Sequence, residues 1–206
     1  MKVVITGASR GIGFEMVKQF LSNGFQVIAI SRNEDKLLEL EQLGAKIIPF
    51  DLTVNDFSLI INVVKSFGQI DILINNAGAL VNKPLSKMTN EDINYLYSVN
   101  VFSTIKLIRD LLVHFSNNAH IVNISSVGGV QGSVKFSGLS TYSSSKGAVN
   151  ILTECFAEEF KNSSLRFNAL ALGSVQTEML NEAFPDYQAS TTAEEMAQYI
   201  LSLIHI

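Results

Sequence analysis

The sequence predicts an α/β fold in which a parallel sheet of about six strands lies between two layers of helices. Strand-like and helix-like segments alternate along the 206 residues, with short loops between them. The strand-like segments are nearly continuous runs of Val, Ile and Leu, the pattern of strands buried on both faces. A chain of this length is ample for one core and short for two. We therefore expect a doubly wound, three-layer architecture in a single domain over residues 1–206.

The first half of the chain predicts strands and helices in strict alternation. Strands are expected at 2–6, 25–31, 46–52 and 71–78, and helices at 12–24, 33–44 and 55–68. Gly24 and Gly44 follow helix-like segments, where a glycine readily supplies the left-handed cap. Asn55 is a plausible cap for the third helix. Pro49 lacks a backbone donor, which predicts that the third strand lies at or near an edge of the sheet.

The second half continues the pattern with longer helices. Helices are expected at 89–117 and 141–162, and strands at 120–126 and 165–172. A last helix is expected to begin near Thr191 and Thr192, because Thr191-x-x-Glu194 fits a capping box. The loops at 79–88, 127–140 and 173–191 all follow strands. They therefore lie at the edge where parallel sheets of this kind bind ligands.

Composition and charge exclude several classes of partner. The net charge is −4 without a basic block, so we do not expect nucleic-acid binding. No apolar run approaches the about 18 residues that span a bilayer, so we expect no membrane partner. The first residues, MKVVITG, enter a strand pattern directly, without the features of a signal peptide. We expect a soluble cytoplasmic protein.

The cysteine and the histidines predict no metal chemistry. Cys155 is the single cysteine, which fits a reducing compartment. It lies at helical spacing from Ile151 and is expected to pack in the core. His114, His120 and His205 have no ligand spacing and are expected to be solvated or structural. Because no cluster of Cys, His and carboxylate residues is evident, we expect no catalytic metal.

A glycine-rich loop, TGASRGIG at 6–13, joins the first strand to the first helix. Gly7, Gly11 and Gly13 permit a tight turn, close approach of a pyrophosphate and close packing of helix on strand. The helix that follows presents free N–H groups and a positive dipole end to phosphates. The loop therefore predicts a Rossmann-like dinucleotide site, to which Ser9 and Ile12 also contribute.

Two arginines favour NADP(H) over NAD(H). NAD sites usually carry an acidic residue at the end of the second strand, which holds the ribose 2′-OH. Here that region reads AISRNED, with Ser31 and Arg32 at the turn. Arg10 lies inside the glycine loop. Two guanidiniums near the expected 2′ position favour a 2′-phosphate, through charge-assisted hydrogen bonds.

Further motifs follow in order along the chain. They are NNAG at 75–78, NVFS at 100–103, IVNISS at 121–126, Tyr142-x-x-x-Lys146 and RFNALALGSVQTEM at 166–179. Together with the glycine loop they resemble the short-chain dehydrogenase/reductase family over about residues 2–180. The resemblance implies an oxidoreductase that transfers a hydride between NADP(H) and a small carbonyl or alcohol substrate. It also implies a homodimer or homotetramer, assembled through the helices at 89–117 and 141–162.

The resemblance implies a role for each motif residue. Tyr142 and Lys146 lie one helical turn apart and face the same way. Tyr142 would be the general acid/base, and Lys146 would lower its pKa and hold the nicotinamide ribose. Ser126 would stabilise the substrate oxygen, and Asn100 would anchor a water that links Lys146 to solvent. The other implied cofactor contacts are Asp51 and Leu52 at the adenine, Asn76, Ala77 and Gly78 at the adenosine ribose, and Val175 and Thr177 at the carboxamide.

The sequence also departs from the family. The segment 127–141 between Ser126 and Tyr142 is longer than usual, so Ser125 remains an alternative for the catalytic serine. Leu172-Gly173 replaces the family's Pro-Gly. The given sequence stops at YILSLIHI, before the family's usual seventh strand, so we expect either a compact member of the family or a chain from which part of the natural protein is absent. The segment 179–191 is then the evident candidate for a lid. A non-catalytic NADP(H)-binding sensor or scaffold is the alternative function, but the complete Tyr–Lys–Ser–Asn set favours an enzyme.

Overall fold

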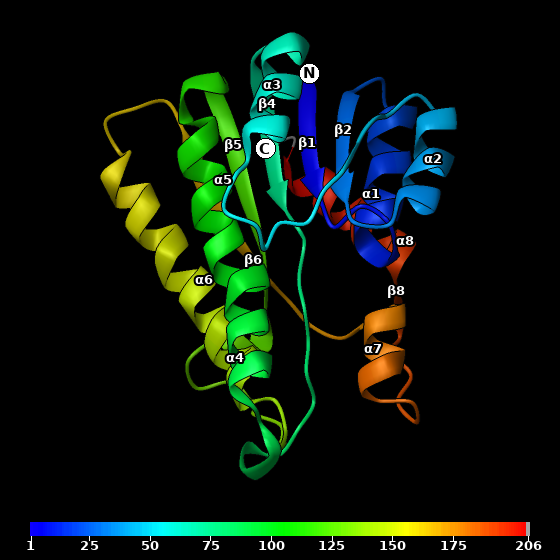
Figure 1. Ribbon diagram of the computed structural model, residues 1–206, viewed down its shortest axis with the longest axis vertical. Coiled ribbons are helices and arrows are strands. Elements are labelled where there is room, and N and C mark those ends of the chain that lie inside the picture. Colours follow the sequence, from blue (N-terminus) through cyan, green and yellow to red (C-terminus); the bar gives the residue numbers. More distant parts are fainter. Residues whose placement is uncertain (205–206) are drawn as a thin grey trace.

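A computed structural model describes residues 1–204 of the protein. Within these residues a six-stranded sheet runs in the order β3-β2-β1-β4-β5-β6, and every neighbouring pair is parallel. The strands are β1 (Lys2–Thr6), β2 (Gln26–Ser31), β3 (Lys46–Pro49), β4 (Ile70–Asn75), β5 (Phe115–Ser126) and β6 (Arg166–Leu172). Figure 1 shows this sheet between layers of helices. The predicted three-layer, doubly wound architecture is confirmed.

Two apolar clusters, one on each face of the sheet, explain the continuous apolar runs. Helices α1 (Gly11–Ser22), α2 (Glu34–Gln42) and α8 (Ala193–Ile204) cover one face. Helices α3 (Ser58–Phe67), α5 (Ser103–Leu111) and α6 (Ser140–Glu159) cover the other. Neighbouring residues of β1 alternate between the clusters, Val3 and Ile5 in the first and Val4 in the second. Because both faces are covered, neither face of the strand needs polar side chains.

Several predicted boundaries are confirmed, and the cap predicted for the third helix is wrong. Gly24 and Gly44 have φ angles of 80° and 102° after α1 and α2. Pro49 ends β3 at the sheet edge, as its missing donor requires. Helix α3 begins at Ser58 and is not capped by Asn55. Instead the Asp56 carboxylate accepts a hydrogen bond from the Ser58 amide at 2.8 Å, one position closer to the helix.

The long helix expected at 89–117 is interrupted and ends earlier than predicted. Helix α4 (Asn90–Tyr97) continues through a π turn (Ser98–Phe102) into α5, and a short 3₁₀ turn (Leu112–His114) follows. Strand β5 then begins at Phe115, so residues 115–117 are strand. The apolar pattern did not distinguish a π turn from α-helix, because a π turn inserts a single residue into an otherwise regular helix.

The chain after β6 contains elements where a loop was expected. Helix α7 (Glu178–Ala183) and two short paired strands, β7 (Val175–Gln176) and β8 (Thr191–Thr192), lie within 173–192. The cap of α8 is one residue later than predicted. The Thr192 hydroxyl accepts from the Glu195 amide at 3.1 Å, and the Glu195 carboxylate accepts from the Thr192 amide at 2.8 Å. No helix in residues 1–204 is long and apolar enough to cross a membrane.

The expectations for the cysteine and the histidines have different outcomes. Cys155 is exposed, and the predicted core position is wrong. It lies one turn from Ile151, whose side chain is 59% exposed, so both belong to the outer face of α6. His120 is buried, and its Nε2 lies 2.7 Å from Asn168 Oδ1. His114 is half-buried next to the start of β5, and His205 lies outside the described residues.

Candidate active site

The glycine loop packs against the NNAG motif at the carboxyl ends of β1 and β4. A Cβ at Gly7 would lie 2.7 Å from Ala77 Cα, and one at Gly13 would lie 2.2 Å from the Gly7 carbonyl oxygen. Gly7 also has a φ of 68°, so the turn requires glycine there. The Asn76 side chain donates to the carbonyl oxygens of Thr6 and Gly7 at 3.0 and 3.2 Å. These contacts hold the two motifs together.

A cavity of about 290 Å³ opens beside the glycine loop. It is lined by Arg10, Arg32, Gly78, Ala79, Leu80, Asn82, Tyr95, Met179, Glu182 and Ala183. Both arginines that the sequence assigned to a 2′-phosphate therefore lie in one cleft. The Arg32 guanidinium donates to the Tyr95 hydroxyl at 3.4 Å. Asp51 lies in the loop that follows β3, where its carboxylate accepts from the Thr53 amide at 2.9 Å, and the neighbouring Leu52 is buried in the core.

The remaining cofactor candidates have mixed surroundings. Ser9 accepts a hydrogen bond from the Ser31 hydroxyl at 2.7 Å, which ties the glycine loop to the end of β2. Ile12 packs against the apolar core. Val175 is buried in β7, and the Thr177 hydroxyl caps α7 by accepting from the Leu180 amide at 3.3 Å. A Cβ at Gly11 would lie 3.2 Å from the Thr177 methyl group, so the glycine loop and the start of α7 are neighbours.

Ser126 and Tyr142 are brought together. The Ser126 hydroxyl lies close enough to the Tyr142 phenol to lower its pKa, and it accepts a hydrogen bond from the Gly128 amide at 3.1 Å. The alternative serine, Ser125, is buried and donates to the Lys146 carbonyl oxygen at 3.1 Å. The geometry therefore favours Ser126 as the partner of the tyrosine.

The long loop between these two residues does not separate them. Its first residues form a 3₁₀ turn (Val127–Gly129) that packs closely on α6. A Cβ at Gly129 would lie 2.5 Å from the Lys146 carbonyl carbon. The additional length lies farther along, where Val134 is 74% exposed and Phe136 is 60% exposed.

Lys146 and Asn100 lie side by side under Gly78. A Cβ at Gly78 would lie 3.5 Å from Lys146 Nζ and 3.6 Å from Asn100 Oδ1. Lys146 Nζ donates to the Ile124 carbonyl oxygen at 2.8 Å. The Asn100 side chain accepts from the Ala79 amide at 2.8 Å and donates to its carbonyl oxygen at 3.0 Å. The π turn at Ser98–Phe102 carries Asn100 into this buried position.

Burial dominates the protonation of both catalytic candidates. It raises the pKa of Tyr142 above its usual value, and the hydrogen bond with Ser126 partly offsets this increase. Burial also lowers the pKa of Lys146 to about 8. The expected lowering of the Tyr142 pKa is therefore reversed in the protein alone. The phenolate would lose hydration, while the Lys146 ammonium is turned toward a backbone carbonyl.

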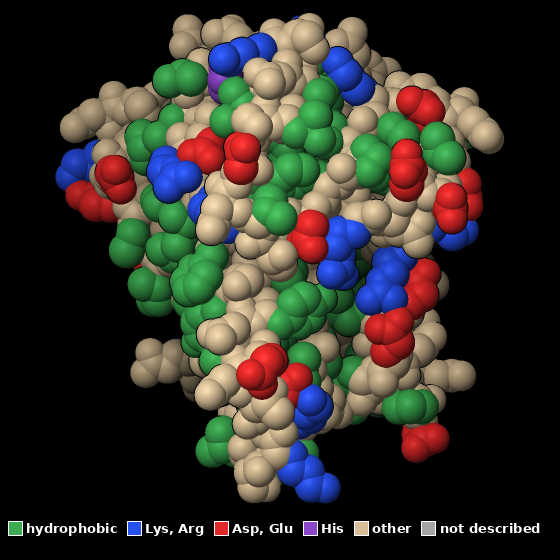
Figure 2. Space-filling view, viewed as in Figure 1, with side chains coloured by type: hydrophobic (Ala, Val, Ile, Leu, Met, Phe, Trp, Pro, Cys, Tyr) green, Lys and Arg blue, Asp and Glu red, His purple; other side chains and the backbone are tan. Residues whose placement is uncertain are grey.

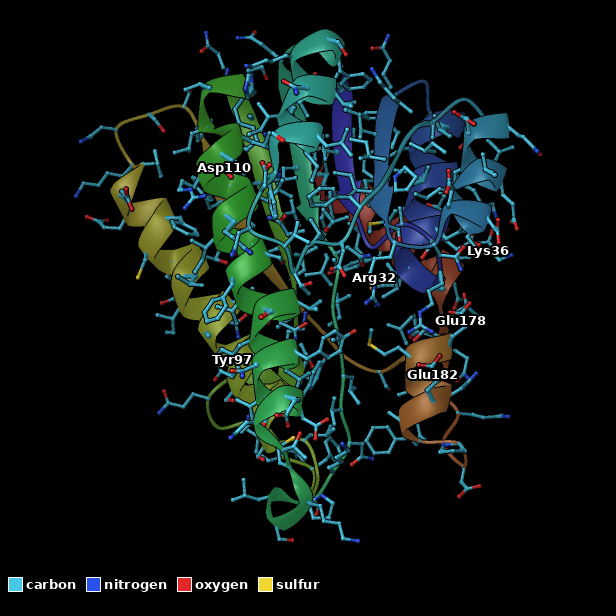
Figure 3. All side chains as sticks on the ribbon, viewed as in Figure 1. Arg32, Lys36, Tyr97, Asp110, Glu178 and Glu182 are labelled. Atoms are coloured by element: carbon cyan, nitrogen blue, oxygen red, sulfur yellow. The ribbon has the colours of Figure 1, made fainter. Side chains whose placement is uncertain are left out.

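Sequence reasoning missed an acidic side chain on the wall of the cleft. Glu182 of α7 accepts two hydrogen bonds from the Arg10 guanidinium, at 2.5 and 3.3 Å. Figure 3 shows Glu178 and Glu182 on this short helix, next to Arg32 at the end of β2. The two glutamates are four residues apart, so they lie on the same face of a helix. A prediction of α7 from the sequence would therefore have revealed an acidic face.

Comparison with known proteins identifies the family of the chain. The profile of the short chain dehydrogenase family matches residues 1–188. The chain is 35% identical to a 3-oxoacyl-(acyl-carrier-protein) reductase of Thermotoga maritima, covering 97% of this chain and 88% of that protein. It is 33% identical to gluconate 5-dehydrogenase of Gluconobacter oxydans, covering 93% and 79%. A short chain dehydrogenase of Shigella flexneri, solved with NADP, superposes with a TM-score of 0.89 at 26% identity, covering 98% of this chain and 90% of the other. The chain belongs to the short chain dehydrogenase family.

Proposed function

We propose that the protein is an NADP(H)-dependent oxidoreductase of carbonyl or alcohol substrates, with Tyr142 as its general acid/base. The observation that carries this proposal is the Ser126 hydroxyl beside the Tyr142 phenol, one helical turn from Lys146 on α6. A tyrosine, a serine and a lysine around one space supply a proton donor, a stabilising hydroxyl and a cation. A protein that only sensed nucleotides would not need a proton donor at this position.

The cleft residues fit a dinucleotide with a 2′-phosphate. The glycine loop gives the close approach that a pyrophosphate requires, since side chains at Gly7 and Gly13 would collide with backbone atoms. Arg10 and Arg32 line the adjoining cavity, and β2 ends in Ser31 without an acidic residue. Two solved relatives, from Shigella flexneri and Burkholderia cenocepacia, are complexes with NADP, whereas another is a complex with NADH. Adenine would lie toward Asp51 and Leu52, and nicotinamide toward Val175 and Thr177.

The cofactor, when bound, supplies or accepts the hydride, and the side chains handle the proton. In the reducing direction Tyr142 donates its phenolic proton to the substrate oxygen as that oxygen gains negative charge. The raised pKa of Tyr142 keeps the phenol protonated before this step. Ser126 donates a hydrogen bond to the same oxygen. The Lys146 ammonium stabilises the phenolate that remains, and Asn100 would anchor a water that links Lys146 to solvent.

The deciding experiment is Tyr142→Phe. We expect the variant to bind NADPH as the wild type does, because the ring is kept. Turnover of a panel of aldehydes and ketones should fall a hundredfold or more, the order of effect of a general acid. Tyr199→Phe is the matched control, since Tyr199 is 55% exposed on α8 and should leave turnover unchanged.

Two results would contradict this proposal. A wild-type protein that binds NADPH yet reduces nothing in a broad panel would support the sensor instead. Tighter binding of NADH than of NADPH would overturn the cofactor preference while leaving the role of Tyr142 intact.

We also propose that the protein works in the cytoplasm as a homodimer or homotetramer. The supporting observation is an outer face, formed by the π turn and α6, that carries exposed apolar side chains. Phe102 is 50% exposed and Ile151 is 59% exposed. Figure 2 shows hydrophobic side chains gathered over α5 and α6. Large apolar patches on a protein surface mark interaction sites.

A further inference from the structure

Helix α7 closes one side of the cofactor cleft through contacts at both of its ends. At its start, the Thr177 methyl would lie 3.2 Å from a Cβ at Gly11, so it touches the glycine loop. At its end, the Asn82 side chain donates to the Ala183 carbonyl oxygen at 2.9 Å. Between them, Glu182 is paired with Arg10. The helix thus links the glycine loop to the loop that follows β4.

The Arg10–Glu182 pair uses the side of the guanidinium that a phosphate would need. Arg10 Nη1 and Nη2 donate to the two carboxylate oxygens of Glu182 at 2.5 and 3.3 Å. This two-point geometry is the one in which arginine recognises both carboxylates and phosphates. Because one guanidinium edge holds one such partner, the carboxylate and a 2′-phosphate compete for it.

The charge around this contact adds to the competition. Glu178 lies one turn before Glu182, and its carboxylate would be 3.5 Å from a Cβ at Gly11. Figure 3 shows both glutamates on the helix that faces Arg32. A phosphate bound at Arg10 would therefore lie beside two carboxylates, and like charges at such distances repel. A dinucleotide without a 2′-phosphate avoids this repulsion and leaves the ion pair intact.

We propose that Glu182 is a cofactor-specificity residue, whose carboxylate competes with the 2′-phosphate of NADP(H) for Arg10. The inference rests on the proposed cofactor preference and adds a residue that opposes it. Binding of NADP(H) exchanges the Glu182 carboxylate for a phosphate and releases this part of α7. Binding of NAD(H) does neither. Glu182 thus reduces the difference in affinity between NADP(H) and NAD(H) that Arg10 and Arg32 create.

The test is Glu182→Gln, which keeps the shape of the side chain and removes its charge. Two probes that differ only in the contested group are adenosine 2′,5′-bisphosphate and adenosine 5′-monophosphate. By calorimetry at low salt, the variant should bind the bisphosphate, and NADPH, about two- to fivefold more tightly, the range expected for an exposed ion pair. Affinity for the monophosphate and for NADH should change less than twofold. Glu159→Gln, the same charge change on α6 far from the cleft, should alter neither.

A second pair of variants separates competition for Arg10 from general repulsion. Arg10→Met should weaken binding of the bisphosphate, and Glu182→Gln added to Arg10→Met should restore less affinity than it adds to the wild type, since only the repulsion is then removed and no guanidinium is left to release. An equal gain in both backgrounds would overturn the inference. The inference would also be overturned if Glu182→Gln left the ratio of the affinities for the bisphosphate and the monophosphate unchanged. A wild type that binds neither dinucleotide would overturn the proposed function itself, a result distinct from these.

Discussion

Lys146 holds an ammonium group in a nearly closed space. Its side chain is 5% exposed, and Nζ donates to the Ile124 carbonyl oxygen at 2.8 Å. Removing a cation from water disfavours its charged form, which is why burial lowers its pKa to about 8. A buried charge with this cost reduces the free energy of unfolding. We infer that Lys146 is kept for its action on Tyr142 and the ribose.

This cost predicts a pH dependence of stability. The unfolded chain holds the Lys146 proton up to its ordinary pKa of 10.5, whereas the folded protein releases it near pH 8. Between these values the unfolded state binds more protons, so the contribution of Lys146 to stability improves as the pH rises. We compare two variants in a Tyr142→Phe background, one with Lys146 and one with Lys146→Met. Between pH 7 and pH 10 the free energy of unfolding of the variant with Lys146 should rise by about 3 kcal/mol relative to that of the Lys146→Met variant. Urea unfolding at each pH measures the free energy of unfolding of both variants. A difference between the variants that stays constant with pH would contradict the prediction.

At the scale of elements, the π turn between α4 and α5 determines where Asn100 lies. The inserted residue shifts the helix face, and Asn100 turns inward to the loop after β4. There its side chain pairs with both backbone groups of Ala79, at 2.8 and 3.0 Å, and donates to the Ser145 hydroxyl at 2.9 Å. Asn100 therefore joins the wall of the cleft to α6, apart from any role in proton transfer.

Asn100→Ala tests this structural role. The substitution leaves the buried amide and carbonyl of Ala79 without their side-chain partner, which costs about 1–3 kcal/mol. We expect a corresponding loss in the free energy of unfolding by urea. Asn94→Ala is the control, because Asn94 is exposed on the neighbouring helix α4 and its loss should stay within about 0.5 kcal/mol. Equal effects of the two substitutions would argue against an anchoring role for Asn100.

At the scale of the whole molecule, the outer face formed by the π turn and α6 predicts self-association. The calculated mass of the chain is 22.6 kDa, so light scattering should give about two or four times this value. Phe102→Glu combined with Ile151→Glu should yield monomers, because burying these charges at an interface is costly. Leu85→Glu is the control, because the Leu85 side chain is 75% exposed in the segment 79–88, away from this face. It should leave the mass in solution unchanged. A monomeric wild type would refute the assembly.

Local patterns predicted most of the sheet but fewer of the surface elements. The apolar runs located every strand of the six-stranded sheet within residues 1–204, because burial on both faces leaves a continuous signal. The short helix α7 was missed, since its six residues are too few for a periodic pattern. The predicted core position of Cys155 was wrong. Helical spacing beside apolar residues indicates that they share a helix face, but it does not indicate whether that face is buried. The wider site is an assembly of loops, which sequence periodicity does not describe.

The sequence by itself determined the α/β class, the glycine-rich loop at 6–13 and the spacing of Tyr142 and Lys146. Each depends on a pattern of residues that are close in the sequence: an apolar run, a glycine pattern or the spacing of one helical turn. Only the tertiary structure decided that Ser126 rather than Ser125 faces Tyr142, because the path of the loop between them depends on its packing on α6. It also decided that Glu182 meets Arg10 across 172 residues of chain. Contacts of that separation arise from the packing of whole elements, and no local period records them.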